Sequence, residues 1–253
     1  MNDELKQLLD EKVSLYNRPD FIETDPIQIP KLFEQKENIE IAGFLAATIA
    51  WGQRPVIIRN AKQLMSAMDN RPHEFLLSTA ERDWLPFMAF KHRTFNGDDC
   101  LFFLRALKHF YSELGGLESV FTDGYRKEHT IAGALRYFRA TFLATAHLHR
   151  SEKHVPDITR GAAAKRLNMF LRWMVRRDSA GVDFGLWTKI PPSALMLPLD
   201  VHSGRQARML GLLSRSQDDW TAVEEVTARL RLMDPNDPVK YDFALFGMGS
   251  LPS

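Results

Sequence analysis

The chain has 253 residues, of which 45% are hydrophobic and 26% charged, as expected for a globular protein. Its single cysteine, Cys100, excludes an internal disulfide, a zinc site built from cysteines and a four-cysteine iron–sulfur cluster. The sequence has no apolar run of about 18 residues, and its first residues are polar. We therefore expect a cytoplasmic protein that does not bind a membrane.

Helical periodicity dominates the chain from beginning to end. Small and apolar residues recur at three- and four-residue spacing over 39–49, which predicts a buried helix. Amphipathic runs follow at 56–68, at 101–114 after a capping turn at 96–99, and at 131–148 after Thr130. A capping box at Thr221–Glu224 predicts a helix that ends near Asp234. Because no hairpin signal lies between alternating strands, we predict an all-α protein with about nine to twelve helices.

The charge is uneven although its sum is only +1. Residues 151–215 carry 11 Lys and Arg against 5 Asp and Glu, whereas the other segments are neutral or acidic. In the segment 161–177, Lys165, Arg172 and Arg176 fall on one stripe of a helix, opposite an apolar face. This pattern predicts an exposed row of cations suited to phosphate groups, or else an ordinary solvated helix face.

Asp200 follows an apolar, proline-bounded segment and precedes a helical run over 201–212. This position predicts a helix N-cap, whose carboxylate accepts bonds from the first N–H groups. A carboxylate fixed in direction at a helix start is also suited to catalysis. Both interpretations stay open at this point.

Three segments carry a family resemblance. Residues 199–212, which contain Asp200, Arg205 and Leu210-Gly211-Leu212, resemble the segment with the essential aspartate in the helix-hairpin-helix-GPD superfamily of DNA glycosylases. Residues 44–54 resemble its early helix, and residues 241–249 its last core helix. The chain as a whole is most similar to domain of unknown function 2400. The resemblance implies a single compact all-α domain over residues 1–253, a two-lobed helical bundle in which N- and C-terminal helices share one lobe and the middle helices form the other.

The chain also departs from the superfamily pattern. The usual leucine-proline-glycine-valine-glycine hairpin is missing before Asp200, so the hairpin is divergent. Lys165 lies 35 residues before Asp200, a separation that resembles the archaeal 8-oxoguanine glycosylase branch. Lys189, in the loop beside Pro191, is the other candidate nucleophile. The cluster cysteines that follow the last helix in many relatives are absent.

By this resemblance the chain is expected to excise a damaged base, such as an oxidised purine, from double-stranded DNA. Lys165 would attack the sugar of a flipped nucleotide, helped by desolvation or by Arg166, while Asp200 would stabilise the positive charge. The expected DNA contacts are Gln53, Arg54, Arg166, Arg172, Arg176, Gly181, Gly185, His202 and Arg205. The expected base-stacking residues are Trp51, Trp173, Phe184 and Trp187. The alternative is that the tryptophans are core residues that bury a large apolar area.

The histidine pattern predicts no metal site. His147, His149, His154 and His202 match no zinc spacing, so we expect neither a metal nor a cofactor. Two other functions remain open, namely a non-catalytic DNA-binding relative of the same fold and an α-helical module that binds an acidic protein. The sequence does not predict the oligomeric state.

Overall fold

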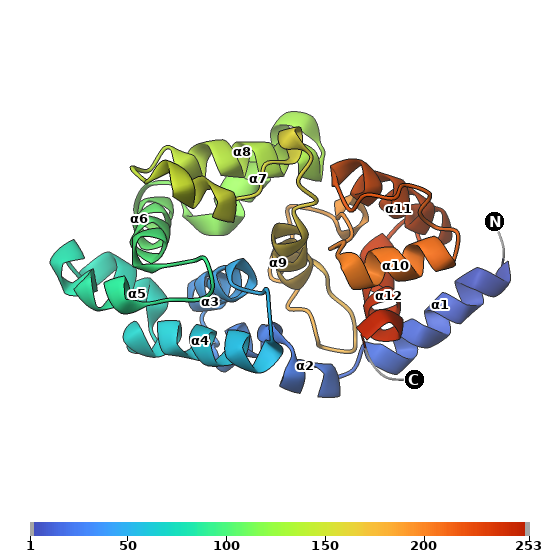
Figure 1. Cartoon of the computed structure of the whole chain (residues 1–253), viewed down its shortest axis with the longest axis horizontal. Coiled ribbons are helices and arrows are strands. Elements are labelled where there is room, and N and C mark those ends of the chain that lie inside the picture. The colour runs from blue at the N-terminus through green and yellow to red at the C-terminus, as the bar shows by residue number, and fades with distance from the viewer. Residues whose placement is uncertain (1–2, 251–253) are drawn as a thin grey trace. The chain divides into compact units, whose positions relative to one another are not determined.

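The computed structural model describes residues 3–250, and these residues form helices joined by loops (Figure 1). No strand occurs among them, and the isolated bridges in this range are His92–Phe95 and Ala162–Asp219. The prediction of an all-α protein is therefore confirmed. No helix in the same range is long and apolar enough to cross a bilayer.

The chain divides into two compact units. The first unit combines the N-terminal segment up to Glu23 with the segment from Asp157 onwards, and the second unit is Thr24–Pro156. The chain therefore leaves the first unit once and returns to it.

The second unit is built around a buried helix, α3 (Lys36–Thr48). Its Phe44 ring packs against Phe103, Phe138 and Phe142, with centroids 5.6–5.9 Å apart, so α3 is buried as its small and apolar residues predict. The other helices of this unit are η1 (Pro26–Gln28), η2 (Pro30–Leu32), α4 (Arg54–Ala67), α5 (Pro72–Ser78), η3 (Glu81–Ala89), α6 (Gly97–Glu113), α7 (Gly116–Glu128), α8 (Ile131–Leu143) and η4 (His149–His154).

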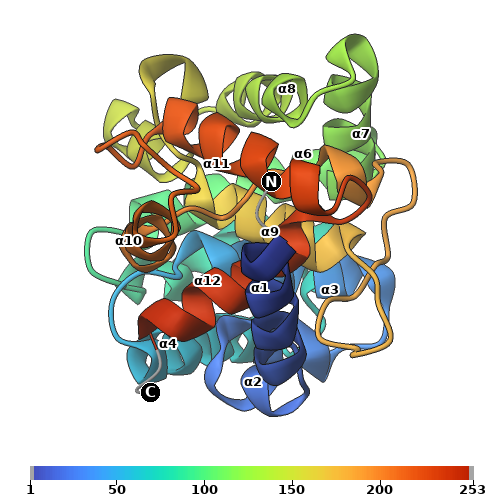
Figure 2. The same ribbon diagram turned by 90° about the vertical axis from the view of Figure 1, so that its right-hand side faces the viewer.

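The first unit brings both ends of the described chain together. Helix α1 (Asp3–Tyr16) packs along α12 (Tyr241–Ser250), and the two helices lie side by side in Figures 1 and 2. Gly247 permits this contact, because a Cβ atom there would lie 2.2 Å from the ring of Tyr16. The remaining elements are α2 (Asp20–Thr24), which crosses the boundary between the units, η5 (Ile158–Arg160), α9 (Lys165–Val175), η6 (Pro192–Ala194), α10 (Val201–Met209), α11 (Trp220–Met233) and η7 (Pro238–Lys240).

At the starts of α9 and α11, a local feature of the chain explains the difference from the prediction. Helix α9 begins at Lys165 rather than Gly161, because Gly161 and Ala164 adopt left-handed backbone conformations with φ of 87° and 50°. Helix α11 begins at Trp220 rather than at the predicted capping box, because Asp219 accepts the N–H of Ala222. The start of α9 places Lys165 in its first turn, where its side chain can reach another element.

Candidate active site

Lys165 and Asp200 meet in the first unit. Lys165 Nζ lies 3.2 Å from Asp200 Oδ2, and the two side chains are 29% and 20% exposed. Lys165 is the first residue of α9, and Asp200 is the residue that precedes α10. Two helix starts that are 35 residues apart in sequence thus bring an amine and a carboxylate together where solvent still reaches both.

Asp200 is the N-cap that the sequence predicts. Its Oδ1 accepts the backbone N–H groups of His202 at 2.9 Å and Ser203 at 3.0 Å, and its own N–H donates to Ser203 Oγ. Burial alone would raise the pKa of the Asp200 carboxyl, but the charge of Lys165 and the N–H groups of the cap lower it below its ordinary value. The carboxylate is therefore charged at neutral pH. Its Oδ1 is hydrogen-bonded to the first turn of α10, and its Oδ2 faces Lys165 Nζ.

We expect Asp200→Asn to reduce the free energy of unfolding by about 1 kcal/mol at neutral pH, since the amide can cap α10 but loses the ion pair. The pKa of Asp200 is lower in the folded chain than in the unfolded chain. Its stabilisation is therefore present at neutral pH and is lost as the pH falls below about 4. Urea unfolding of both proteins at a series of pH values should show the difference between them shrinking towards acid pH.

Asp98→Asn is the matched control for this prediction. Asp98 lies exposed in the first turn of α6, and its substitution should leave the free energy of unfolding almost unchanged at every pH. A difference between Asp200→Asn and the original chain that is constant with pH would contradict the ion-pair account.

The two arginines of the predicted cationic row are buried. Arg172 and Arg176 are 4% and 2% exposed. Arg172 pairs with Asp183 at 3.2 Å and with Asp242, and its guanidinium lies over the ring of Phe243. The prediction of an exposed row is therefore wrong for both arginines, because neither presents its charge to solvent or to a phosphate.

Arg176 has three acidic partners. Its guanidinium lies 2.7 Å from Asp178, 3.0 Å from Asp183 and 2.9 Å from Asp237. Burial opposes the charge of Arg176, but these carboxylates raise its pKa above the ordinary value. We call the set Arg172, Arg176, Asp178, Asp183, Asp237 and Asp242 the buried charge network.

Asp242 is one of the four aspartates of this network, none of which was identified from the sequence. It lies in the first turn of α12, and its side chain is 8% exposed. Burial raises its pKa to about 6, opposed by Arg172, reinforced by Asp200 and again opposed by Lys165. The acidic residue inside the apolar run 241–249 was the available signal, because a carboxylate on a buried helix needs a cationic partner.

The predicted stacking residues of the first unit lie mostly in its interior. Trp173 and Trp187 are fully buried at 0% and 2% exposed, and Trp187 meets Phe170 edge to face. They are core residues, so the prediction that they stack on a base is wrong. Phe184 is half-buried, and its backbone N–H donates to the carbonyl of Trp173.

The backbone conformation of the turn after α9 explains its two glycines. Gly181 and Gly185 have φ of 71° and 58°, and a Cβ atom on Gly185 would lie 2.4 Å from Cβ of Arg177. Within this turn the N–H of Phe184 donates to the carbonyl of Trp173, so it is not available to a phosphate. Gly181 is exposed.

The other predicted residues of the first unit differ in their exposure to solvent. His202 and Arg205 are exposed on α10, and Nδ1 of His202 lies 3.2 Å from the carbonyl oxygen of Gly249. Arg166 is half-buried, and burial lowers its pKa to about 10. Lys189 is exposed in the loop before η6. Of the two candidate lysines, Lys165 is the one that contacts Asp200.

The remaining predicted residues belong to the second unit. Trp51 is half-buried, with its ring edge-on to His92 and stacked on His154. Gln53 is exposed at the N-cap of α4 but makes no side-chain cap bond, and Arg54 is half-buried. His154 lies 3.2 Å from the buried carboxylate of Asp99, which also accepts the hydroxyl of Ser151. Across residues 3–250 no group of three or more His, Cys, Asp or Glu side chains could hold a metal ion.

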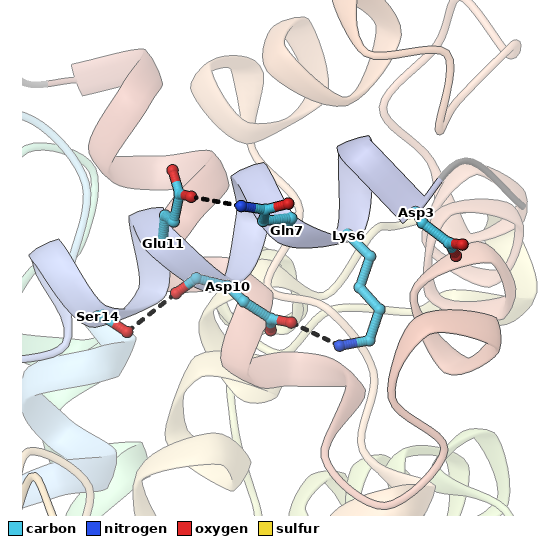
Figure 3. Close-up of a pocket in the computed structure, with 6 residues that line it drawn as sticks. All are labelled: Asp3, Lys6, Gln7, Asp10, Glu11 and Ser14. Carbon is cyan, nitrogen blue, oxygen red and sulfur yellow. Dashed lines mark hydrogen bonds and ion pairs between the residues drawn. The ribbon is translucent and has the colours of Figure 1, made fainter.

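A shallow hollow on α1 is a further surface feature (Figure 3). Its lining comes from this one helix, where Lys6 donates to Asp10 and Gln7 donates to Glu11 at i, i+4 spacing. Such pairs are the ordinary polar face of a surface helix, and four of the six side chains that line the hollow bond to one another. We therefore place the candidate chemistry at Lys165 and Asp200.

Comparison with known proteins supplies the family. The model of the family described as protein of unknown function (DUF2400) matches residues 25–251. The chain belongs to the DUF2400 family. The match covers nearly the whole chain and includes Lys165, Asp200 and Asp242, so the DUF2400 part of the sequence resemblance is confirmed. No curated protein and no solved structure matches this DUF2400 chain.

Proposed function

We propose that the chain is a DNA base-excision repair enzyme, a glycosylase with abasic-site lyase activity, in which Lys165 is the nucleophile and Asp200 the stabilising carboxylate. The observation that carries the proposal is the 3.2 Å contact between Lys165 Nζ and Asp200 Oδ2, with both side chains partly exposed. The resemblance of residues 199–212 to the aspartate segment of the glycosylases supports the same assignment.

The proposed reaction uses the two groups in turn. Neutral Lys165 Nζ forms a bond to C1′ of a flipped nucleotide, and the bond between C1′ and the base breaks, so the base leaves with the electron pair and takes up a proton. The C1′–O4′ bond then opens: one nitrogen proton is transferred to O4′, which becomes a hydroxyl, and the nitrogen lone pair forms the C1′=N bond of a protonated Schiff base. Asp200 remains an anion beside the positive charge at C1′, held in that direction by its bonds to α10.

Borohydride trapping tests this proposal. Hydride reduces a Schiff base to a stable amine, so the chain should form a covalent complex with duplex DNA that holds an abasic site or an 8-oxoguanine. The matched control is the same duplex with an undamaged base, which should give no complex. Binding that weakens with salt but gives no adduct would indicate the non-catalytic DNA-binding relative instead. No duplex binding at all would contradict both, and would favour the helical interaction module.

A further inference from the structure

Helix α9 starts from a backbone conformation that few residues adopt. Its N-cap is Ala164, with φ of 50°, and alanine has no side-chain oxygen that could accept an N–H group of the helix. A residue other than glycine costs free energy in the left-handed region, and it stays there only where the surrounding structure holds it. Lys165 follows directly, so this conformation sets the direction in which its side chain leaves the chain.

Asn168 holds this turn from the interior. The residue is 1% exposed, and its Nδ2 donates to the carbonyl oxygen of Ala163 at 3.2 Å. Asn168 is three residues after Lys165, so the two side chains lie on the same face of α9, one turn apart. A buried amide on the face of Lys165 thus fixes the carbonyl group two residues before that lysine.

The other polar atom of the Asn168 side chain makes no hydrogen bond. Its Oδ1 is buried and has no partner among residues 3–250. A buried acceptor without a partner costs free energy, and a leucine of similar size would fill the space without a polar atom. Stability of the interior therefore does not explain an asparagine at this position, whereas the bond to Ala163 does.

The beginning of the same turn is anchored to the start of α11. The N–H of Trp220 donates to the carbonyl of Gly161 at 3.1 Å, and Ala162 forms an isolated bridge with Asp219. The turn over residues 161–164 is therefore fixed at both ends, by α11 and by Asn168.

We propose that this turn positions Lys165 opposite Asp200, and that Asn168 is the positioning residue that holds it in its left-handed conformation. The inference rests on the proposed function for its catalytic meaning. Asn168 acts through the carbonyl of Ala163 and the backbone of Ala164, and it does not touch a substrate.

Zero-length cross-linking of the full chain tests this inference without a substrate. A water-soluble carbodiimide activates a carboxyl, and an amine in contact with it then displaces the urea and forms an amide. Lys165 should be joined to Asp200, which lies 3.2 Å away, and mass spectrometry of the digested chain quantifies the product. The yield should fall by about tenfold in Asn168→Leu, because an intramolecular reaction depends steeply on the position of its two groups.

Ala164→Gly covers the case in which Asn168→Leu does not fold. Glycine adopts the left-handed region without strain but is also free to leave it, so the turn is no longer fixed. The midpoint of urea unfolding should stay nearly the same, since relief of strain offsets the greater freedom of glycine in the unfolded chain. The yield of the Lys165–Asp200 product should nevertheless fall. An unchanged yield in either folded variant would overturn the inference.

Two controls separate positioning from a general effect on the fold. Lys240 and Asp234 lie 2.7 Å apart in the same unit, and their cross-link should keep its yield in every variant. His129→Gly replaces another left-handed residue, exposed at the end of α7 with φ of 54°, and should leave the Lys165–Asp200 product unchanged. Parallel losses at both pairs would mean a structural role only, and would also overturn the inference.

The catalytic consequence is measured separately. In Ala164→Gly the rate of borohydride trapping at saturating protein should fall while the Kd of the abasic duplex stays the same, and an unchanged rate in a chain that traps DNA would overturn the inference. Cross-linking involves no DNA. Failure of the original chain to trap a damaged duplex would therefore refute the proposed function, whereas the cross-link would still decide whether the turn positions Lys165.

Discussion

Replacing Lys165 by methionine is expected to reduce the yield of borohydride-trapped DNA complex by at least about 1000-fold, because the substitution removes the amine that forms the Schiff base in the proposed mechanism. Methionine keeps most of the length of the side chain, and the position is partly exposed, so the fold should be retained. The measurement is the fraction of labelled abasic duplex that migrates as a covalent complex in a denaturing gel.

Lys189→Met is the matched control for this experiment. Lys189 belongs to the same unit and is exposed in a loop, whereas the contact to Asp200 is made by Lys165. The control should trap DNA as the original chain does. If Lys165→Met still traps while Lys189→Met does not, Lys189 is the nucleophile and the assignment drawn from the ion pair is wrong. Peptide mapping of the trapped complex identifies the modified lysine independently.

Arg176→Met is expected to lower the free energy of unfolding by about 3–5 kcal/mol, the usual cost of removing one partner from a buried ion pair. The substitution leaves Asp178, Asp183 and Asp237 without their shared cation, and Asp183 is fully buried. Asp237 then loses its cation and Asp183 keeps only Arg172, so the buried negative charge is no longer balanced, and its protonation or hydration costs free energy. Equilibrium unfolding in urea measures the effect.

Arg177→Met is the control, because the next residue along the chain is an exposed arginine. Its free energy of unfolding should change by no more than about 0.5 kcal/mol. The pair of variants also separates a structural Arg176 from a phosphate contact. A phosphate contact would leave the stability nearly unchanged and reduce the salt dependence of DNA binding by about one ion, and this result would contradict the burial of Arg176.

The Lys165–Asp200 pair and the buried charge network contain the same kinds of residue but differ in their exposure to solvent. Lys165 and Asp200 are partly exposed, as the proposed function requires of groups that react with a substrate. Arg172 and Arg176 lie on the same predicted stripe as Lys165 but are enclosed by four aspartates. Their role is to fix α9, the loop after it and α12 against one another, which holds Lys165 opposite Asp200.

The local pattern of the chain was sufficient for the helical class and for the cap of α10. Spacing of apolar residues determines which segments are helical, and a carboxylate before a helical run satisfies the first N–H groups wherever the helix lies. For this reason the buried helix α3 and the N-cap role of Asp200 were predicted from neighbouring residues alone. Errors at helix starts arise where two neighbouring residues can both serve as the N-cap. In α11 the N-cap is Asp219 rather than the predicted Thr221.

Only the tertiary structure decided which cations face solvent. Helical spacing predicts that Lys165, Arg172 and Arg176 share a face, but α9 ends before Arg176, and the environment of these cations depends on carboxylates elsewhere in the chain. Asp242, the partner of Arg172, is 70 residues further along, and no periodicity relates the two. The pairing of Lys165 with Asp200 likewise required both helix starts to be brought together. The sequence by itself therefore determined the helices and the N-cap at Asp200. Long-range packing determined that Arg172 and Arg176 are neutralised in the interior and that Lys165 remains partly exposed.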